Sequence, residues 1–356
     1  MAYLGLIEGF YGSYYSDEMR KQIMSFMHKH DYSFYIYAPK NDGRLRKTWD
    51  KDLSADRYSY LHHMAEYGTK SSLQFGVGLS PLNISLDYDE HKKQYLQKYV
   101  HNICKDKKVE IFALLFDDVK LQCSEIGQIQ NTIIKDVMHE LPLHIKKFIV
   151  CPSYYTFDPI LDRIFGTRPD NYFCDLCSAM DKSVEFFWTG NKVLSDDISV
   201  DDIQKANALF DRKVFIWDNY PVNDGKKISQ YIYTKSFKGR YNLEAVTAGH
   251  AVNPMLEPKL SLISMLTLPL IYKNTATDDI ERQRESYIHK IFTDNSDTVL
   301  EFFDEVLECG LDNLNEHNVS SMLTLCSRYE HISEYKEIKD FLNHVYVFDP
   351  DYPDTE

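Results

Sequence analysis

Two consecutive aspartates, Asp117 and Asp118, stand at the end of the apolar run 112–116. The run is aromatic and aliphatic and is short for a helix, which indicates a buried strand. Successive side chains of a strand point to opposite faces, so both carboxylates can serve one site only if the strand ends there. Two close carboxyl groups titrate as a coupled unit, which suits general acid–base chemistry. The alternative is that Asp118 only caps a following helix.

Similar apolar runs recur along the chain and predict the elements that would position this pair. Their starts are spaced by about 34 residues, the length of a strand followed by a helix. Amphipathic stretches such as Tyr15–Lys29 and Tyr88–Cys104 lie between them. Eight such units in about 250 residues predict the α/β class and a (β/α)8 TIM barrel, and no G-x-G-x-x-G follows the first strand to favour a doubly wound sheet. The eight predicted strands are Leu4–Phe10, Tyr32–Pro39, Ser72–Pro81, Val109–Asp118, Lys147–Tyr155, Glu185–Gly190, Lys213–Pro221 and Leu243–Pro254.

The pattern changes after about residue 258. Leu260–Thr267 could still be the eighth barrel helix, and the segments Asp278–Phe292, Asp297–Leu307 and Val319–Tyr346 are predicted to be mostly helical. We therefore predict a catalytic barrel over residues 1–258, a C-terminal helical region over 259–347 and an acidic, proline-interrupted tail over 348–356. Three roles stay open for the helices, which could form a homodimer contact, complete the active-site wall or stabilise the barrel.

Composition excludes several classes of partner. The chain of 356 residues has a formal charge of −14, which disfavours nucleic acid and anionic membrane surfaces as partners. No apolar stretch reaches about 18 residues, and no basic-then-apolar leader opens the chain, so the sequence predicts a cytoplasmic protein. The 26 Tyr and 20 Phe residues are high counts, and surplus aromatic rings can stack on sugars, although most belong in a core.

Cysteine and histidine spacing predicts no metal ion and no other cofactor. Seven cysteines are an odd number and do not form a disulfide framework, and the pair Cys174 and Cys177 has no second pair to complete a zinc site. The thirteen histidines show no H-E-x-x-H spacing, and the chain has neither a G-x-x-x-x-G-K-[ST] nor a G-x-S-x-G motif.

Polar residues gather at the predicted ends of the strands. In a (β/α)8 barrel the reactive groups lie on the rim that the C-terminal strand ends form, so residues far apart in sequence would meet there. Such a rim could hold a neutral, hydroxyl-rich ligand by hydrogen bonds and stacking. The candidate site residues are Gly9, Lys40, Asp117, Asp118, Tyr155, Trp188, Trp217, Asn219, Asp224 and Asn253.

The motifs at these strand ends resemble glycoside hydrolase family 84, the β-N-acetylglucosaminidases that include O-GlcNAcase and bacterial relatives once called hyaluronidases. The resemblance rests on Gly9–Gly12, Tyr37–Lys40, Phe112–Asp118, Trp217–Asp224 and Asn253–Met255, in this order. The chain departs from the family pattern at three places, namely Ser13–Tyr15, Asn41 and Leu82. These departures bear on the predicted loop shape and on the subsites beyond the sugar. They bear less on the predicted catalytic chemistry.

The resemblance implies a retaining exo-β-N-acetylglucosaminidase with substrate-assisted catalysis, in which the 2-acetamido oxygen of the substrate attacks the anomeric carbon and forms an oxazoline. It implies that Asp117 orients the acetamido N–H and stabilises the developing positive charge. Asp118 would be the general acid that protonates the leaving oxygen and then the base that activates water.

The resemblance also implies binding roles for the other rim residues. Gly9 would offer a backbone carbonyl where a side chain would block the sugar. Lys40 and Asn253 would hold ring hydroxyls, Asn219 would help to position the acetamido group, and Asp224 would accept hydrogen bonds from the O4 and O6 hydroxyls.

Three aromatic assignments are less determined. Tyr155 would bond the acetamido oxygen or guide its attack, and its neighbour Tyr154 is the alternative because the sequence does not fix which ring points inward. Trp188 and Trp217 would wall the acetamido pocket, or they are ordinary core residues.

The predicted substrates are terminal β-linked GlcNAc units, on Ser or Thr of glycoproteins rather than on small oligosaccharides. Two readings from other classes stay open. The chain could be a catalytically silent GlcNAc-binding barrel, although binding alone needs no acid. It could also be a metal-dependent deacetylase or lyase, which the lack of a His/Asp cluster at the strand ends disfavours.

Overall fold

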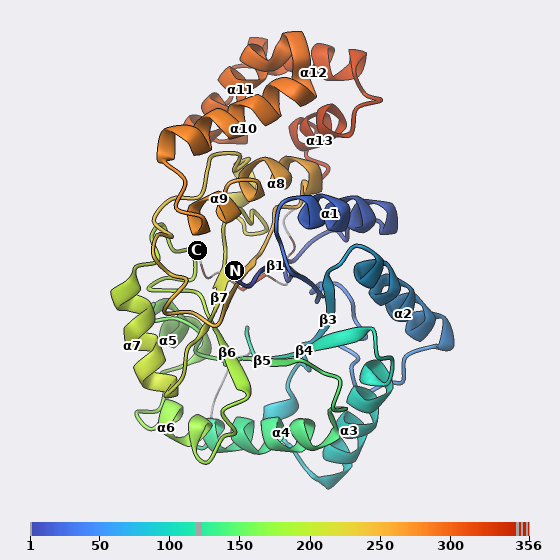
Figure 1. The fold of residues 1–356 in the computed structure, drawn as a ribbon, viewed down its shortest axis with the longest axis vertical. Coiled ribbons are helices and arrows are strands. Elements are labelled where there is room, and N and C mark those ends of the chain that lie inside the picture. Colours follow the sequence, from blue (N-terminus) through green and yellow to red (C-terminus); the bar gives the residue numbers. More distant parts are fainter. Residues whose placement is uncertain (1, 119–122, 347–348, 350–351, 354, 356) are drawn as a thin grey trace.

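The structure is a computed structural model that describes the whole chain except residues 1, 119–122, 347–348, 350–351, 354 and 356. Its centre is a closed barrel in which each strand pairs in parallel with the next and the last strand returns to the first (Figure 1). This arrangement confirms the predicted (β/α)8 barrel. The strands are β1 (Leu4–Glu8), β2 (Phe34–Tyr37), β3 (Gln74–Leu79), β4 (Val109–Leu115), β5 (Lys147–Cys151), β6 (Val184–Trp188), β7 (Phe215–Asp218) and β8 (Gly249–Val252).

Seven observed strands lie within the predicted runs, and β6 begins at Val184, one residue before its run. Strand β8 is much shorter than its run, which begins at Leu243. A turn precedes the strand, because Asn242 has a left-handed φ of 61° and the N–H of Val246 donates to the carbonyl oxygen of Leu243. Pairing with β7 starts only at Gly249. Local turn chemistry therefore overrides the apolar character of this segment.

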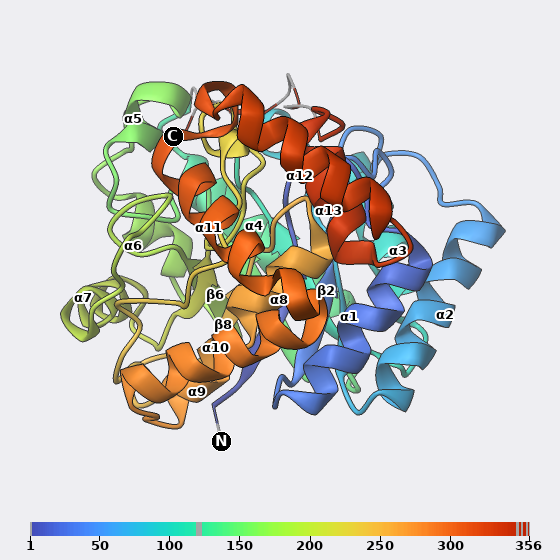
Figure 2. The same ribbon diagram turned by 90° about the horizontal axis from the view of Figure 1, so that it is seen from above.

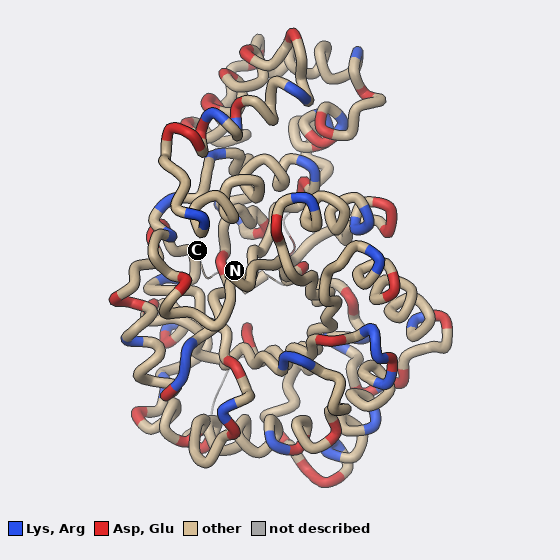
Figure 3. The backbone as a smooth tube through the Cα atoms, in the orientation of Figure 1, with Lys and Arg blue, Asp and Glu red and all other residues tan. Residues whose placement is uncertain are grey.

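Helices cover the outside of the barrel between successive strands up to β7, whereas the connection from β7 to β8 has no α-helix among the described residues (Figure 1). Helix α1 shows why they form where they do: Ser16 accepts a hydrogen bond from the N–H of Met19, and Asp17 and Glu18 stand in the first turn. Charged residues lie mostly on these outer elements (Figure 3). The helices up to β8 are α1 (Asp17–Lys29), α2 (Ala55–Lys70), α3 (Glu90–Cys104), α4 (Ile126–Glu140), α5 (Ile160–Phe165), α6 (Tyr172–Cys177) and α7 (Val200–Phe210).

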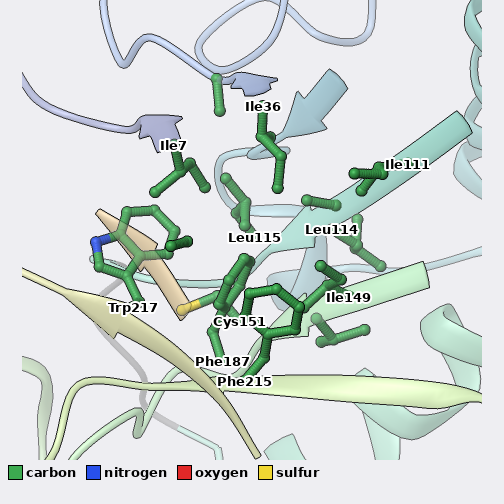
Figure 4. Close-up of a cluster of buried hydrophobic side chains, with 14 of the residues drawn as sticks. Ile7, Ile36, Ile111, Leu114, Leu115, Ile149, Cys151, Phe187, Phe215 and Trp217 are labelled. Carbon is green, nitrogen blue, oxygen red and sulfur yellow. The ribbon is translucent and has the colours of Figure 1, made fainter. Parts of the chain in front are cut away.

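The barrel interior is filled by apolar side chains from facing strands (Figure 4). Ile7, Leu115, Phe187, Phe215 and Trp217 meet there, and all are at most 5% exposed. Interior packing of this kind makes the barrel a solid core, so a ligand can bind only at its ends.

After β8 the chain forms a group of helices that packs beside the barrel (Figure 2). Their apolar faces make a second buried cluster with Ile232 and Met255 from the barrel part of the chain. The predicted stretch Val319–Tyr346 is divided into two helices, because the first ends at Arg328 and the next begins at Ser333. The homodimer contact, one of the three roles left open for these helices, stays untested. The helices are α8 (Pro258–Met265), α9 (Leu268–Tyr272), α10 (Thr277–Phe292), α11 (Ser296–Cys309), α12 (Glu316–Arg328) and α13 (Ser333–Leu342).

Within the described residues, no helix combines the length and the apolar character that a membrane crossing requires. The predicted tail over 348–356 falls partly outside the described residues, and of its members Asp349, Tyr352, Pro353 and Thr355 are described.

Candidate active site

A pocket opens at the C-terminal ends of the strands. Strand alternation explains which side chains reach it: Ile7, Leu115 and Trp217 point into the barrel, and the residues two positions further along are Gly9, Asp117 and Asn219. Nine of the ten predicted site residues line this pocket. They are Gly9, Lys40, Asp117, Asp118, Tyr155, Trp217, Asn219, Asp224 and Asn253.

Both aspartates reach the same pocket because the chain bends after β4. The strand ends at Leu115, and Asp118 adopts a left-handed backbone with φ of 61°. This conformation is uncommon for residues other than glycine, although Asp tolerates it better than most. The turn brings the side chain of Asp118 to the side that Asp117 already faces, so the two carboxylates share one site.

Asp117 lies in a cationic environment. Its Oδ2 forms an ion pair with Lys40 Nζ, and both side chains are almost fully buried. Burial alone would raise the pKa of Asp117, but the charges of Lys40 and Arg46 hold this pKa below its usual value. Its second oxygen, Oδ1, is buried and has no hydrogen-bond partner among the described residues. Asp117 is therefore an ionised carboxylate with one acceptor atom available to a donor in the pocket.

Asp118 lies between two tyrosines. The hydroxyl of Tyr11 donates to Oδ2 at 2.8 Å, and that of Tyr155 donates to Oδ1 at 3.0 Å. Burial and the negative charge of Asp117 raise the pKa of Asp118, and the cations Lys40 and Arg46 offset only part of this rise. The neighbouring carboxyl groups thus have pKa values shifted in opposite directions.

A chain of hydrogen bonds fixes the side of the pocket formed by β7 and β8. Asn219 Oδ1 accepts from Trp217 Nε1 at 2.9 Å and from Asn253 Nδ2 at 3.0 Å, and Asn219 Nδ2 donates to the Val193 carbonyl oxygen. These bonds leave Asn253 Oδ1 buried and without a partner among the described residues. The Asn253 amide therefore presents a fixed acceptor to a ligand.

Gly9 is required by packing at this rim. A Cβ atom at this position would lie 2.4 Å from a ring carbon of Trp217, far inside van der Waals contact. Lys40 Nζ lies 5.7 Å from the centre of the same ring, within cation–π distance. The indole of Trp217 thus forms a pocket wall that only glycine can approach from β1.

Asp224 belongs to the pocket lining. Its Oδ2 accepts a hydrogen bond from the backbone N–H of Tyr11 at 2.7 Å. This bond ties the loop after β7 to the loop after β1 and orients the carboxylate of Asp224.

The structure does not bring Trp188 to the pocket. This side chain is fully buried and packs edge-to-face against Phe157, Phe173 and Phe210 beneath the outer helices. Tyr154 also points away, because its hydroxyl donates to the carbonyl oxygen of Gly166 and its ring packs on Tyr172. Tyr155 is the tyrosine of this pair that faces the site.

Sequence reasoning missed several residues of the site. Tyr11 stands inside the Gly9–Gly12 motif and could have been found there. Arg46 had no sequence signal: it is buried, and it donates to the Tyr11 hydroxyl at 3.0 Å and to Ser80 Oγ at 2.9 Å. Two tail residues, Tyr352 and Thr355, also line the pocket.

The side chains of the pocket suit a neutral polar ligand. In the described part of the chain, no three His, Cys, Asp or Glu residues are grouped so that they could hold a metal ion. The pocket instead combines carboxylates, amides, hydroxyls and one indole wall, which is the chemistry that a sugar requires.

Comparison with known proteins places the chain among sugar hydrolases. Residues 4–304 match the beta-N-acetylglucosaminidase family. The protein O-GlcNAcases of Mus musculus and Rattus norvegicus are each 25% identical to the chain over 279 residues. The match covers 76% of this chain but only 30% of each of these relatives, so the chain spans less than a third of their length.

Two solved structures share the fold. An Asp-to-Asn mutant of Thermobaculum terrenum O-GlcNAc hydrolase has a TM-score of 0.73 at 24% identity, covering 96% of this chain and 81% of that one. CpGH84B has a TM-score of 0.74 at 22% identity, covering 95% of this chain and 66% of that one. At these identities the likeness shows a common architecture.

Proposed function

The chain belongs to the beta-N-acetylglucosaminidase family, glycoside hydrolase family 84, and from this premise we propose that it is a retaining exo-β-N-acetylglucosaminidase with substrate-assisted catalysis. The observation that carries the proposal is the different surroundings of the aspartate pair: Lys40 forms an ion pair with Asp117, whereas Asp118 is held by the hydroxyls of two tyrosines. These surroundings lower the pKa of Asp117 and raise that of Asp118. Asp117 is then charged while Asp118 still holds a proton. The mechanism needs this combination of one charged and one protonated carboxyl group.

In the first step the acetamido oxygen of the substrate forms a bond to the anomeric carbon as the glycosidic bond breaks. Asp118 gives its proton to the leaving oxygen. Asp117 accepts a hydrogen bond from the acetamido N–H through Oδ1, which has no partner among the described residues, and stabilises the positive charge of the oxazoline ring.

In the second step water attacks the anomeric carbon from the side that the leaving group vacated. Asp118, now a carboxylate, takes the proton of this water, and the bond to the acetamido oxygen breaks. Two inversions leave GlcNAc with its original β configuration. The hydroxyls of Tyr11 and Tyr155 stabilise the charged form of Asp118 between the two steps.

Sugar binding would use the other acceptors of the pocket. Asn253 Oδ1 and the carboxylate of Asp224 would accept hydrogen bonds from ring hydroxyls, with Asp224 on O4 and O6. Enclosing the non-reducing end in this way permits only exo cleavage. Trp217 would form the wall beside the acetamido methyl group.

We infer that the natural substrates are Ser- or Thr-linked GlcNAc units of proteins. The support is the match to relatives named protein O-GlcNAcase, together with polar groups from several strand ends that line one small pocket. Such a pocket leaves the group beyond the glycosidic bond weakly specified. Small GlcNAc-terminated oligosaccharides are the second candidate, because the Ser13–Tyr15 loop differs from the family pattern at the rim.

The test is hydrolysis of an aryl β-N-acetylglucosaminide, with the aryl β-glucoside as the matched control. The acetylated substrate should be cleaved, also in the presence of a chelator, and the glucoside should not be, because it lacks the nucleophile. Cleavage of both, or a covalent sugar adduct on an aspartate, would contradict the substrate-assisted scheme.

A competition between an O-GlcNAc-modified protein and chitobiose at equal sugar concentration tests the substrate class. Release of GlcNAc mainly from the protein is expected. Release from chitobiose alone would reject the protein as the substrate, and internal fragments from hyaluronan would reject exo cleavage.

A further inference from the structure

The segment that follows β3 holds Arg46 beside the site. The side chain of Arg46 is buried, and its Nη1 donates to Ser80 Oγ at 2.9 Å. The backbone is fixed as well, because the N–H of Ser80 donates to the Leu45 carbonyl oxygen at 2.8 Å and the N–H of Leu82 donates to the Arg46 carbonyl oxygen at 3.3 Å. Arg46 is not among the residues that line the pocket, so it does not itself contact a bound sugar.

Tyr11 connects Arg46 to the proposed general acid. Arg46 Nη2 donates to the hydroxyl oxygen of Tyr11 at 3.0 Å, and this hydroxyl donates to Asp118 Oδ2 at 2.8 Å. A guanidinium group only donates hydrogen bonds, so the direction of the first bond is fixed. Burial and the charge of Asp118 raise the pKa of Tyr11 well above its usual value, so the hydroxyl keeps its proton. In the described part of the chain, its acceptor is Asp118.

The two oxygens of Asp118 therefore differ. With a proton on Oδ2, the Tyr11 oxygen would face two donors, Arg46 and Asp118, and the proton of Tyr11 would lose its acceptor. An unsatisfied buried donor is unfavourable. Oδ1 lies 3.0 Å from the hydroxyl of Tyr155, and no described residue donates to that hydroxyl. Tyr155 can thus either donate to Oδ1 or accept from it.

We propose that Arg46 is a positioning residue, which fixes Tyr11 as a donor to Asp118 Oδ2 and thereby assigns the acid proton to Oδ1. This deepens the proposed function and rests on it, because it names the atom that gives the proton. In the first step the bond between Oδ1 and its proton breaks, the proton goes to the leaving oxygen, and the electron pair stays on Oδ1. Both tyrosines then donate to the carboxylate, as in the structure.

Two other roles for Arg46 make different predictions. If Arg46 only joins its own segment to Ser80, its loss should weaken the reaction equally for all leaving groups. Its charge also lowers the pKa of Asp117, and loss of that effect would again be felt with every leaving group. Action through Tyr11 concerns the general acid alone, so its loss should depend on the leaving group.

Neutron diffraction from a deuterium-exchanged crystal of the unmodified protein tests the proton assignment directly. At acidic pH the deuterium of Tyr11 should point at Asp118 Oδ2, and the carboxyl deuterium should be bonded to Oδ1. At neutral pH the direction of Tyr11 should be the same. A deuterium bonded to Oδ2, or a Tyr11 deuterium directed away from Asp118, would overturn the proposal.

Kinetics of Arg46→Met on aryl β-N-acetylglucosaminides of graded leaving-group pKa tests the role in the reaction. The loss of kcat/KM should be about tenfold larger for poor than for activated leaving groups, because a hydrogen-bonded chain that supports a charged group is broken. Arg46→Lys keeps the charge and a donor and should recover most of this loss. Ser80→Ala is the matched control: it removes the other side-chain bond described above and should leave the dependence on the leaving group unchanged.

The same substitution in a Tyr11→Phe background separates action through Tyr11 from a direct effect. The extra loss with poor leaving groups should disappear there, because residues that act through one another are not additive. An extra loss of equal size in both backgrounds, or an equal loss across all leaving groups, would overturn the positioning role. If Arg46→Met does not fold, Arg46→Gln takes its place with the same expectation, since an amide can accept as well as donate.

The two measurements also separate this proposal from the proposed function. If the unmodified protein hydrolyses none of the substrates, the proposed function is wrong, and the neutron result alone decides whether Arg46 and Tyr11 assign the proton to Oδ1. If hydrolysis occurs but the deuterium is bonded to Oδ2, the function stands and the positioning role of Arg46 is rejected.

Discussion

Among the described residues, the buried carboxyl pairs Asp117–Asp118 and Glu257–Glu337 have different surroundings. Asp117 and Asp118 lie at the end of β4 beside Lys40 and Arg46. Glu257 and Glu337 lie at the junction between the barrel and the C-terminal helices, and in the described part of the chain neither forms an ion pair with Lys, Arg or His.

The junction pair is held by hydrogen bonds from neutral donors. Glu337 on α13 accepts from the backbone N–H groups of Lys259 and Leu260 at the start of α8, at 2.9–3.0 Å. Glu257 accepts from Asn223 Nδ2 at 2.8 Å. Burial raises the pKa of Glu257 to about 7, and it raises that of Glu337 well above its usual value, with a further rise from the charge of Glu257.

The comparison shows that a raised pKa does not by itself mark a catalytic group. Burial raises both pKa values at the junction, and among the described residues no Lys, Arg or His forms an ion pair that would offset it. At the pocket the cations overcome burial for Asp117 but not for Asp118. The proposed mechanism depends on this difference between the pKa values of the two neighbours, rather than on the burial of either one.

The largest expected effect is that of Asp118→Asn on substrates with poor leaving groups. Loss of the general acid should lower kcat/KM by about 10²–10⁴-fold for such substrates, and far less for activated aryl glycosides, whose leaving groups need little protonation. The measurement is a series of aryl β-N-acetylglucosaminides of graded leaving-group pKa. Equal losses across the series would remove Asp118 from the role of acid.

Asp117→Asn should lower kcat by about 10²–10³-fold with every leaving group, because it removes the charge that stabilises the oxazoline. The same substrate series measures this variant, and the slope of rate against leaving-group pKa should match that of the unmodified protein. A loss confined to poor leaving groups would mean that the two aspartates have exchanged roles.

Glu257→Gln should change how stability depends on pH. The folded-state pKa of about 7 lies above the unfolded value of 4.5, so the folded state binds the extra proton between these values. The contribution of Glu257 is fully present below pH 4.5 and is lost as the pH rises through 7. It amounts to up to about 3 kcal/mol.

The check is the free energy of unfolding from urea titrations at pH 5 and pH 8. The decrease between the two values should be smaller in Glu257→Gln than in the unmodified protein. An identical decrease in both proteins would show that the folded-state pKa of Glu257 is close to its unfolded value, which would contradict the raised pKa.

The smallest effect is expected for Glu337→Ala, which leaves the N–H groups of Lys259 and Leu260 without their acceptor. The free energy of unfolding should fall by about 1–3 kcal/mol, and Glu337→Gln, which keeps a carbonyl oxygen, should lose less. The kcat/KM of the folded protein should stay unchanged in both variants. A loss of activity as large as that of Asp118→Asn would contradict the prediction that the junction pair takes no part in the reaction.

Much of the barrel could be predicted because strand periodicity is a local signal. Apolar runs at regular spacing gave all eight strands, and the rule that reactive groups stand at strand ends gave nine residues that the structure brings to one pocket. Helix division after Arg328 was missed, because the hydrophobic pattern of the two helices continues across the short break.

Other features could not be predicted because they depend on contacts between distant segments. Trp188 follows the same strand-end rule as Trp217, yet its ring packs under α7, and no local pattern separates the two. Arg46 donates to Tyr11, 35 residues away, and Glu337 accepts from Leu260 across 77 residues.

The sequence by itself determined the barrel, the adjacent carboxyl groups and the family that the motifs resemble. Each of these depends on residue types that lie close together in the sequence. Only the tertiary structure decided how the two aspartates differ. Their pKa values depend on Lys40, Arg46 and burial, and Asp118 faces the pocket because of one left-handed backbone angle. The structure also placed Thr355 in the pocket, since burial arises only when distant parts of the chain enclose the same space.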